Sequence, residues 1–572
     1  MYTVYNFEAK SIQTYILDSS KLKDMVGASE QIEYLCHPED GLLAIVLKGL
    51  DFQGTINIAR QAGGAIQAIF SNEDDAKRFQ AVWTFCVQKA LPGLTFAQGM
   101  KTAGKLEDAI ENTRKAWFKH NHNAFFPTLP LAGPLVARSP RTGQPAVLRI
   151  KLKEGSERLD ATTAQKREFR HGTLLTDSLH FKTDRPIYWP INLDDKDQEL
   201  DEKTFPLLPD NRYIAIVHAD GNNFGQLIKE IQKKLLNKSD ITAVEYAQTI
   251  RDFSKAIKDI AFDATKKAII HIVVQGAQQR FEIMPARPLV LGGDDFTFIV
   301  RGDLALDFTQ NFLKEFEEQS KTALADLKKK YRDLASLPDF PEQLTACAGI
   351  AYIKASQPFY QGYRLADSMC KQAKRFSKDN CDEKETVPSS LIFHRITTSI
   401  IDDYESILKY ELRHDILKPK ETKKISKTKS EAKADADGIQ FTMQPYLVGN
   451  IKPKSVKYVH LDNLVALRQF LTKPQISQGT FREFLTLLEM SQEQAESAMQ
   501  RWYDNTKNSG QENLLNELKV ILEDLHIDQQ SPNALTLTGF KTEIDKITYF
   551  RTPIGDALAL ISISKGSNYV PD

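Results

Sequence analysis

The order of apolar and polar positions predicts alternating strands and amphipathic helices over the first hundred residues. Short runs rich in Val, Ile, Tyr and Phe predict strands, and apolar residues three or four apart predict helices. Two adjacent glycines, Gly63 and Gly64, separate apolar runs and predict a tight hairpin turn. The predicted order is a strand over 2–7, helical segments over 12–35 with a break near Gly27, a hairpin over 62–70, a helix over 74–90 and a strand over 94–100.

The same order of elements recurs in the middle of the chain. Both parts contain a Gly-Gly hairpin and a later strand of the pattern LTxxxG. Such self-similarity predicts an internal duplication of a β-α-β-β-α-β, ferredoxin-like unit. The second copy is predicted as a strand over 213–217, helices over 226–236 and 243–267, a hairpin over 289–300, a helix over 304–329 and a strand over 344–350.

The two copies differ in their acidic residues. The second hairpin carries Asp294–Asp295 after its two glycines, where the first has Ala65–Ile66. A further acid, Asp220, directly follows the first strand of the second copy, and no acid of the first copy corresponds clearly to it. We therefore expect the second copy to carry the chemistry and the first to be catalytically silent.

The remaining segments predict the domain boundaries. Residues 136–200 are polar and irregular, and their basic residues favour a solvated excursion over a nucleic-acid contact. Residues 418–437 contain almost no apolar side chains, which predicts a flexible charged linker. Amphipathic helices are expected at 461–471, 481–490, 492–505 and 514–525. The predicted α+β chain thus has a first copy with its insertion over 1–200, a second copy over 205–415, a linker over 416–438 and a helical domain over 439–572.

Composition narrows the class of protein. The 572 residues include 75 Lys and Arg against 75 Asp and Glu, which argues against a globally basic nucleic-acid coat. The five cysteines form no CxxC pair, so we expect reduced thiols and neither a zinc ribbon nor a disulfide frame. No leader pattern or membrane-spanning run is evident. We expect a soluble cytoplasmic protein with no membrane contact.

The stretch LVLGGDDFTFIV over residues 289–300 is the most informative part of the chain. Two adjacent carboxylates, Asp294 and Asp295, stand at the tip of an apolar hairpin, and a divalent cation is the usual reason to keep like charges there. Asp220 would complete the site from the neighbouring strand, and the carbonyl of Gly221 could reach the cation. The sequence therefore predicts Mg²⁺ or Mn²⁺ at Asp220, Gly221, Asp294 and Asp295, as a two-metal site.

Phosphate groups would bind beside these carboxylates. Gly292 and Gly293 lack Cβ atoms and allow phosphate close to the backbone, and Gly225 stands at a helix N-terminus whose amides favour phosphate. Lys371 and Lys374 share a face of a later helix, and one of them would pair with triphosphate oxygens. Taken singly, the Asp pair is most often a polar turn, Asp220 an N-cap and Lys374 a solvated residue. Their conjunction on successive elements favours a metal–nucleotide site.

These residues carry a resemblance to a known fold. GGDD at a hairpin, DGNNFG after the first strand and ADxxxxxAK on a late helix resemble the palm, or cyclase, fold of GGDEF diguanylate cyclases and of the large polymerase-like subunit of type III CRISPR effector complexes. The motif matches at Asp220, Phe224 and Lys374, and at Asn222, where a second acid often sits. The resemblance implies that Asn222, Asn223 and Phe224 shape a sugar or base pocket.

The CRISPR subunit is the closer of the two resemblances. It also has two palm domains, the first degenerate, and a small helical C-terminal domain. Residues 7–16 and 21–29 are similar to its first-palm opening, and residues 389–394 to the strand that closes its second palm. The family commonly has an HD nuclease domain, which we do not find, so we expect no DNase activity. It also often carries a cysteine zinc site, and residues 139–146 look like its flanking sequence without the cysteines.

The resemblance implies a nucleotidyltransferase that makes cyclic oligoadenylate from ATP in antiviral signalling. The expected catalytic residues are Asp220, Asp294 and Asp295, and the partners implied are CRISPR effector subunits, guide RNA and target RNA. Three alternatives stay open: a standalone cyclase that makes a cyclic dinucleotide without guide RNA, a non-catalytic nucleotide-binding scaffold, and a template-directed polymerase. The last is disfavoured because no fingers or thumb-sized basic region is evident. Base preference, ring size, activator and oligomeric state are not predicted.

Overall fold

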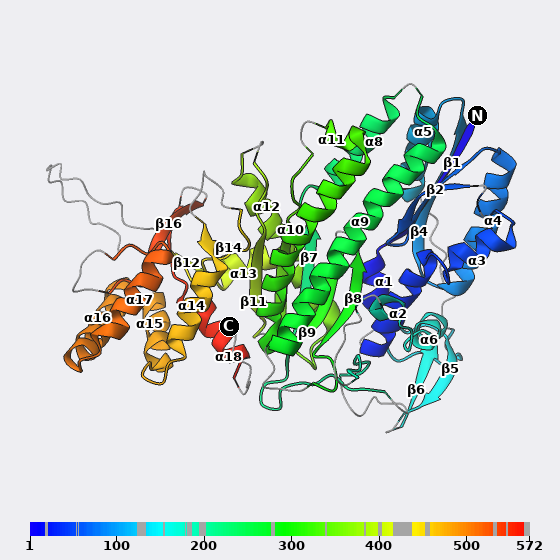
Figure 1. Ribbon diagram of the computed structural model, residues 1–572. Helices are drawn as coiled ribbons and strands as arrows, with labels where there is room; N and C mark the ends of the chain where they lie inside the picture. Colours follow the sequence, from blue (N-terminus) through cyan, green and yellow to red (C-terminus); the bar gives the residue numbers. More distant parts are fainter. Residues whose placement is uncertain are drawn as a thin grey trace, which may run out of the picture.

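The computed structural model shows an elongated molecule, with the N-terminal sheet at one end and the C-terminal helices at the other (Figure 1). The structure describes residues 1–565 except 18–20, 53, 55, 123–132, 153–154, 178, 180–185, 194–201, 239, 276–280, 294, 338–339, 383–384, 398–402, 416–437, 452–457, 530–534 and 545–546. The predicted Asp294 and nearly all of the predicted linker lie outside these residues.

The first copy is built on a four-stranded antiparallel sheet of order β2-β3-β1-β4. Its core lies on one face, where Tyr5 and Phe7 pack edge-on against Phe79 and Trp83. Helix α5 covers the other face, and Gly99 of β4 gives it room, since a Cβ there would lie 2.5 Å from the Trp117 nitrogen. The elements are β1 (Tyr2–Lys10), α1 (Ile12–Leu17), α2 (Leu22–Cys36), α3 (Leu42–Gly49), β2 (Asn57–Ala62), β3 (Ala65–Phe70), α4 (Glu73–Ala90), β4 (Thr95–Ala103) and α5 (Leu106–His122).

The second copy repeats this strand order within a seven-stranded sheet, β15-β14-β11-β10-β7-β9-β8. Helices α8, α9 and α10 cover one face, and α12 covers the other (Figure 1). The predicted duplication is thus present in the topology, and the α+β class is confirmed. The elements are β7 (Tyr213–Gly221), α8 (Phe224–Leu236), α9 (Ala243–Ile270), β8 (Ala286–Gly292), β9 (Asp295–Arg301), α10 (Ala305–Lys330), α11 (Arg332–Ala335), β10 (Ala346–Lys354), α12 (Phe359–Asp379), β11 (Ser390–Arg395) and α13 (Tyr404–Tyr410).

The two copies pack against each other through equivalent elements. Helix α9 of the second copy lies against β2 of the first, and α2 of the first lies against β8 of the second. The Arg251 guanidinium donates to the Ile58 carbonyl at 2.9 Å on one side, and the Ser29 hydroxyl donates to the Leu289 carbonyl at 2.5 Å on the other. The copies therefore face each other as the halves of a pseudo-symmetric dimer do.

The insertion between the copies is ordered around β5 (Ala146–Lys151), β6 (Ser156–Asp160), α6 (Ala161–Glu168) and α7 (Leu174–Asp177). Helix α2 is continuous through Gly27, so the predicted break there is wrong. A Cβ at Gly27 would lie 1.7 Å from the Lys166 carbonyl, which shows that the glycine serves the crossing of α2 by α6. Arg141, predicted to be solvated, instead pairs with Glu157 at 2.7 Å.

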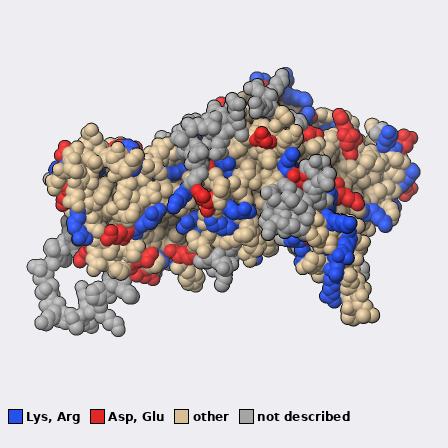
Figure 2. Space-filling view, turned by 90° about the horizontal axis from the view of Figure 1, so that it is seen from below, with Lys and Arg blue, Asp and Glu red and all other residues tan. Residues whose placement is uncertain are grey.

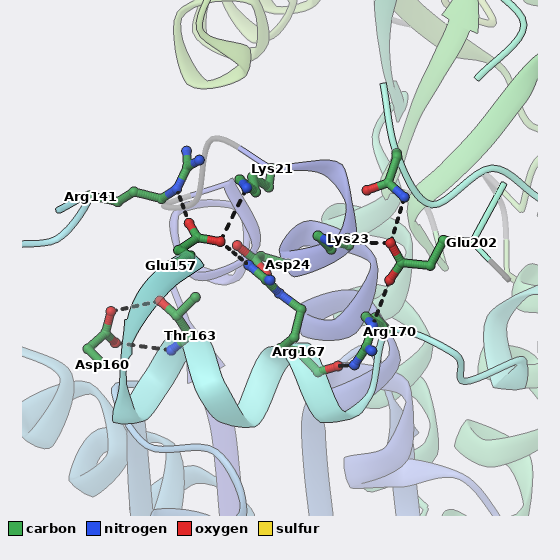
Figure 3. Close-up of polar contacts among 11 residues, drawn as sticks. Lys21, Lys23, Asp24, Arg141, Glu157, Asp160, Thr163, Arg167, Arg170 and Glu202 are labelled. Atoms are coloured by element: carbon green, nitrogen blue, oxygen red, sulfur yellow. Dashed lines mark hydrogen bonds and ion pairs between the residues drawn. The ribbon is translucent and has the colours of Figure 1, made fainter. Parts of the chain in front are cut away.

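Buried charges join this insertion to the start of α2 (Figure 3). Glu202 is fully buried and accepts from Lys23 at 3.2 Å and from Arg170 at 2.9 Å. Glu157 lies 3.2 Å from the Lys21 ammonium, and Arg167 pairs with Asp24. Removing one partner of such a pair would leave a buried charge without a counter-charge, which is strongly destabilising. The network therefore holds this part of the chain in place.

The C-terminal region contains the four expected helices, together with a fifth helix, α18, and several strands that the sequence pattern did not predict. The helices are α14 (Leu461–Leu471), α15 (Gln478–Met490), α16 (Gln492–Asn508), α17 (Glu512–Asp524) and α18 (Ile554–Ile563). The strands are β12 (Arg413–Asp415), β13 (Gly438–Gln440), β14 (Tyr446–Leu447), β15 (Val459–His460), β16 (Gly539–Ile544) and β17 (Ile547–Arg551). Since β14 pairs with β11 of the second sheet, chain pairing crosses the boundary predicted at 438.

Acidic and basic side chains are interspersed over much of the surface (Figure 2). Lys and Arg gather along a projection at the lower right of that view. Arg149, Lys151 and Arg158 of the β5–β6 hairpin are exposed. Among the described residues, we find no helix with the length and apolar character needed to cross a membrane.

Candidate active site

Two acidic residues lie opposite each other at the ends of neighbouring central strands. Asp220 of β7 is the register partner of Asp295 of β9, and such cross-strand pairs have Cβ atoms about 5 Å apart. The hairpin turn is shorter than predicted. Gly292 already pairs with Asp295, so Asp295 is the first residue of β9 and not part of the turn. Gly293 has a φ of 66°, a left-handed conformation that favours glycine.

Asp295 stands in an environment that does not favour its negative charge. Burial raises its pKa, the Asp220 and Asp367 carboxylates raise it further, and His218 and Gln13 act in the opposite direction. Gln13 donates to Oδ2 at 2.5 Å, and His218 Nδ1 lies 3.6 Å from Oδ1. Oδ1 is buried, and no group that the structure describes donates a hydrogen bond to it. A positive charge near Oδ1 would offset the cost of ionising this carboxyl group.

Lys374 reaches the same place from α12. Its ammonium donates to Asp220 Oδ2 at 2.7 Å and to the Gly221 carbonyl at 2.6 Å. Lys371 points elsewhere: it pairs with Asp367 at 2.6 Å and its side chain is 73% exposed. The structure thus brings Lys374, and not Lys371, together with the predicted metal ligands.

The other predicted residues divide into two groups. Asn223 and Gly225 are exposed at the start of α8, and a Cβ at Gly225 or Gly293 would meet no atom within 4 Å. The side chains of Asn222 and Phe224 point into the interior: Asn222 donates to Thr345 Oγ1 at 2.9 Å, and the Phe224 ring lies 6.0 Å from that of Phe253. The structure does not bring these two side chains together with the carboxylates, and their pocket roles stay predictions.

The donor set suits a divalent cation. Asp220 and Asp295 offer carboxylate oxygens and Gly221 offers a carbonyl oxygen, which are the ligands that Mg²⁺ and Mn²⁺ prefer. Oδ1 of Asp295, which has no hydrogen-bond donor among the described residues, is a ready acceptor, and the Lys374 ammonium already bridges Asp220 and Gly221 as a cation would. Within the described ranges, which omit Asp294, no three His, Cys, Asp or Glu side chains cluster as a metal site.

Sequence reasoning missed three residues that contact or flank Asp295. His218 lies two residues before Asp220 on the same strand face, and its Nε2 is 3.7 Å from Asp367. Alternation along the strand could have placed His218 beside Asp220. Asp367 is part of the ADxxxxxAK motif, and its position one turn before Lys371 was visible. Gln13 carried no such signal, because its contact with Asp295 joins residues 282 positions apart.

Residues 213–382 match the family described as Cas10/Cmr2, second palm domain. This segment is similar to a Cas10/Cmr2 second palm domain. The predicted resemblance to the polymerase-like CRISPR subunit is thereby confirmed, and the palm domain contains Asp220, Asp295 and Lys374. No curated protein matches the chain in sequence.

Solved structures show a more distant likeness. A crystal structure of a Csm1–Csm4 cassette in complex with cA4 has 14% identity and a TM-score of 0.40, over 69% of this chain and 54% of that chain. The same cassette with one ATP gives 13% identity and 0.37, over 66% and 53%, and the apo cassette gives 12% and 0.37, over 69% and 54%. The chain spans about half the length of these proteins.

The first copy has a counterpart of the palm site. It lies one residue away from the position that matching the two Gly-Gly pairs in the sequence gives. Glu8 pairs with Ala65 as Asp220 pairs with Asp295, so Ala65, not Ile66, stands at the position of Asp295. An acid does correspond to Asp220, namely Glu8, which corrects the prediction that none does. A pocket of about 250 Å³ opens there, and Arg60, Arg114 and Trp117 line it beside Glu8. The first copy has thus exchanged one carboxylate for alanine and gained basic side chains.

Proposed function

We propose that this chain is a metal-dependent nucleotidyltransferase that makes cyclic oligoadenylates from ATP. The observation that carries the proposal is the pair of carboxylates on adjacent strands of a Cas10/Cmr2 palm domain, with Oδ1 of Asp295 buried and without a described donor. Lys374 supplies a positive charge at the same point. Groups of this kind bind the phosphates of a nucleoside triphosphate through a cation and an ammonium.

In the proposed reaction, the 3′-oxygen of one nucleotide attacks the α-phosphorus of another. A new P–O bond forms, the bond to the pyrophosphate oxygen breaks so that pyrophosphate leaves, and the proton of the 3′-hydroxyl passes to solvent water. A bound Mg²⁺ or Mn²⁺ would supply charge neutralisation at the phosphates and a lower pKa for the hydroxyl. Asp220, Asp295 and the Gly221 carbonyl would hold the cation, together with the predicted ligand Asp294. Lys374 would exchange its contact with Asp220 for triphosphate oxygens.

The joining of two nucleotides needs two nucleotide sites, and we propose that the first copy, as a degenerate palm, presents the second. Its pocket beside Glu8 contains two guanidinium groups for phosphate and an indole for stacking on a base. A second pocket, of about 340 Å³, shares Glu8 and Arg60 with the first and continues past Lys10 and Gln13 to Asp295. The two pockets thus connect the degenerate site to the palm carboxylates.

The decisive experiment is incubation of the purified protein with ATP, and then with each other nucleoside triphosphate, in Mn²⁺ or Mg²⁺. Products would be identified by mass spectrometry with and without RNA. Cyclic oligoadenylates that disappear in the Asp294→Ala/Asp295→Ala variant would establish the activity, and cA4 is the first standard to compare. ATP binding without any product, under all these conditions, would overturn the proposal in favour of a nucleotide-binding scaffold.

The role of RNA is tested in the same reactions. We propose that the chain works with CRISPR effector subunits, guide RNA and target RNA, so product should increase when an assembled guide–target complex is added. A cyclic dinucleotide formed equally well without RNA would identify a standalone signalling cyclase instead. Primer extension on an added template would identify a polymerase.

A further inference from the structure

The carboxylate at the centre of the palm site is held by a residue of the other copy. Gln13 lies on α1 of the first copy, and its amide donates to Asp295 Oδ2 at 2.5 Å. A carboxylate has two oxygens, and this contact engages one of them. The other, Oδ1, is buried without a donor among the described residues and lies 3.6 Å from His218 Nδ1. One side of Asp295 is therefore fixed by an amide, and the other remains available.

We infer that Gln13 is a positioning residue for the metal-binding carboxylate of the palm, supplied by the catalytically silent copy. A hydrogen bond to one oxygen limits rotation of the carboxyl group and leaves the other oxygen oriented toward the proposed cation. Ligating carboxylates in metal sites are commonly oriented in this way by an outer partner. The inference rests on the proposed metal site. It gives the first copy a role in that site, although the first copy has Ala65 at the position of Asp295.

Helix α1 is too short to hold Gln13 in place by itself. A helix of six residues is unstable alone, so its position depends on what packs around it. Lys166 of α6 donates to the Tyr15 carbonyl at 2.5 Å, and its ammonium lies 4.3 Å from the centre of the Tyr15 ring. The Tyr15 hydroxyl donates to Gln31 of α2 at 2.8 Å. Both α2 and α6 thus anchor α1.

The buried charges in Figure 3 extend this anchor to the whole insertion. Lys21 and Lys23, which lie just after α1, pair with Glu157 and Glu202, and Arg167 of α6 pairs with Asp24 of α2. These pairs fix α6 against α2. Because Lys166 of α6 contacts Tyr15 of α1, the position of α6 also fixes the position of α1. The insertion, although remote from the carboxylates, therefore determines where the Gln13 amide lies.

The test measures Mn²⁺ binding by the nucleotide-free, full-length protein, by isothermal titration calorimetry or by electron paramagnetic resonance of free Mn²⁺. Gln13→Met keeps an unbranched side chain and removes the donor. We expect its Mn²⁺ affinity to fall about tenfold or more, the usual effect of losing an outer partner of a ligand. Gln67→Ala is the matched control: it removes another first-copy glutamine that contacts the second copy, where the Tyr246 hydroxyl donates to it at 3.3 Å. Its Mn²⁺ affinity should stay within about twofold of wild type.

The outcomes separate this inference from the proposed function. If Asp295→Asn abolishes Mn²⁺ binding while Gln13→Met binds as wild type does, the positioning role is wrong and the metal site stands. If the wild-type protein binds no Mn²⁺, both the metal site and the role of Gln13 are overturned. Equal losses in Gln13→Met and Gln67→Ala would show that Gln13 acts only through the packing of the two copies. Thermal midpoints of the variants identify any that fail to fold.

Discussion

At the residue scale, Asp295 shows a conflict between stability and binding. Burial and two neighbouring carboxylates raise its pKa, so its ionised form destabilises the fold in the absence of a cation. We expect Asp295→Asn to raise the thermal midpoint of the metal-free protein and to abolish the further rise that Mn²⁺ gives the wild type. Thermal unfolding with and without Mn²⁺ measures both effects. Product formation should fall about 100-fold or more, because a metal ligand contributes several kcal/mol. An unchanged Mn²⁺ effect would exclude Asp295 as a ligand.

Lys374 and Lys371 can now be distinguished. Lys374 contacts Asp220 and Gly221, whereas Lys371 is largely exposed and pairs with Asp367. We expect Lys374→Met to lower kcat/KM for ATP about 10- to 100-fold, the range for losing one charged hydrogen-bond donor. Lys371→Met should change it by no more than about threefold, as is usual for exposed ion pairs. Steady-state kinetics with ATP would decide, and the reverse ranking would contradict the placement of α12.

The acids and the lysine of the site could be predicted because each stands at the end of a recognisable strand or on a helix with a clear period. Gln13 and His218 were missed, for different reasons. Gln13 meets Asp295 only because two copies dock, and no local pattern reports such a contact. His218 follows the strand predicted over 213–217, so no strand face was assigned to it, although its ring packs edge-on at 5.3 Å from that of Tyr363 on α12. Phe224 shows the opposite case: it belongs to the sequence motif, yet its side chain packs in the hydrophobic core and not at the site.

At the scale of elements, α12 carries Asp367 and Lys374 and packs on β10 without space between them. A Cβ at Gly349 would lie 2.0 Å from the Ala366 carbonyl and 2.7 Å from the Cys370 nitrogen. Gly349→Ala should therefore displace α12 and cost about 1–3 kcal/mol of stability, as overpacking does. Synthesis should fall with it, because Lys374 moves away from Asp220. Gly104→Ala, where a Cβ meets nothing within 4 Å, is the control for thermal unfolding and activity.

A buried ion pair across the two copies predicts a pH dependence. Burial raises the pKa of Glu30 on α2 from 4.5 to about 7, and Arg287 of β8, 3.9 Å away, only partly opposes this. The folded protein therefore holds this proton more tightly than the unfolded chain. The contribution is fully present below about pH 4.5 and is lost as the pH rises through about 7, an effect of about 3 kcal/mol.

The comparison with Glu30→Gln isolates this contribution. Gln carries no titrating proton, so the thermal midpoint of the wild type relative to the variant should fall between pH 4.5 and pH 8. Other groups that titrate in this range are shared by both proteins and cancel in the difference. A difference that stays constant with pH would show that Glu30 is already ionised at pH 5.

Element types were predictable over most of the described chain, and registers were not. The Gly-Gly signal located both hairpins, yet the turn of the first falls on Gly63–Gly64 and that of the second begins one residue later, at Gly293. Because side chains alternate between the faces of a strand, this one-residue difference in the turns determines which residues correspond. Glu8 and Ala65 of the first copy stand at the positions of Asp220 and Asp295. The short strands β12 to β15 escaped prediction because two or three residues carry no measurable period.

For the whole molecule, the duplication places two unequal sites against one interface. The palm copy keeps the carboxylates, and the first copy contributes the Gln13 amide to the palm site and keeps a pocket lined by Arg60 and Arg114. Repetition of elements made the duplication readable from the sequence. The docking of the copies was not readable, because it joins residues far apart in the sequence, through apolar clusters that both copies share and through polar contacts such as that of Arg251 with the Ile58 carbonyl.

The proposed need for both copies is tested at their interface, with a residue that lines neither pocket. The Arg251 guanidinium donates to the Ile58 carbonyl at 2.9 Å, joining α9 to the edge strand β2. We expect Arg251→Met to reduce oligoadenylate synthesis about tenfold, since charged hydrogen bonds contribute about 1.5–3 kcal/mol and their loss lets the copies shift. Mn²⁺ affinity should also fall, because the shift moves the Gln13 amide of the first copy relative to Asp295. Lys267→Met, which breaks an exposed pair with Glu315 within the second copy, is the control on the same helix. Full synthesis by Arg251→Met at wild-type rate would mean that a single palm is sufficient and that the first copy's pocket has another use.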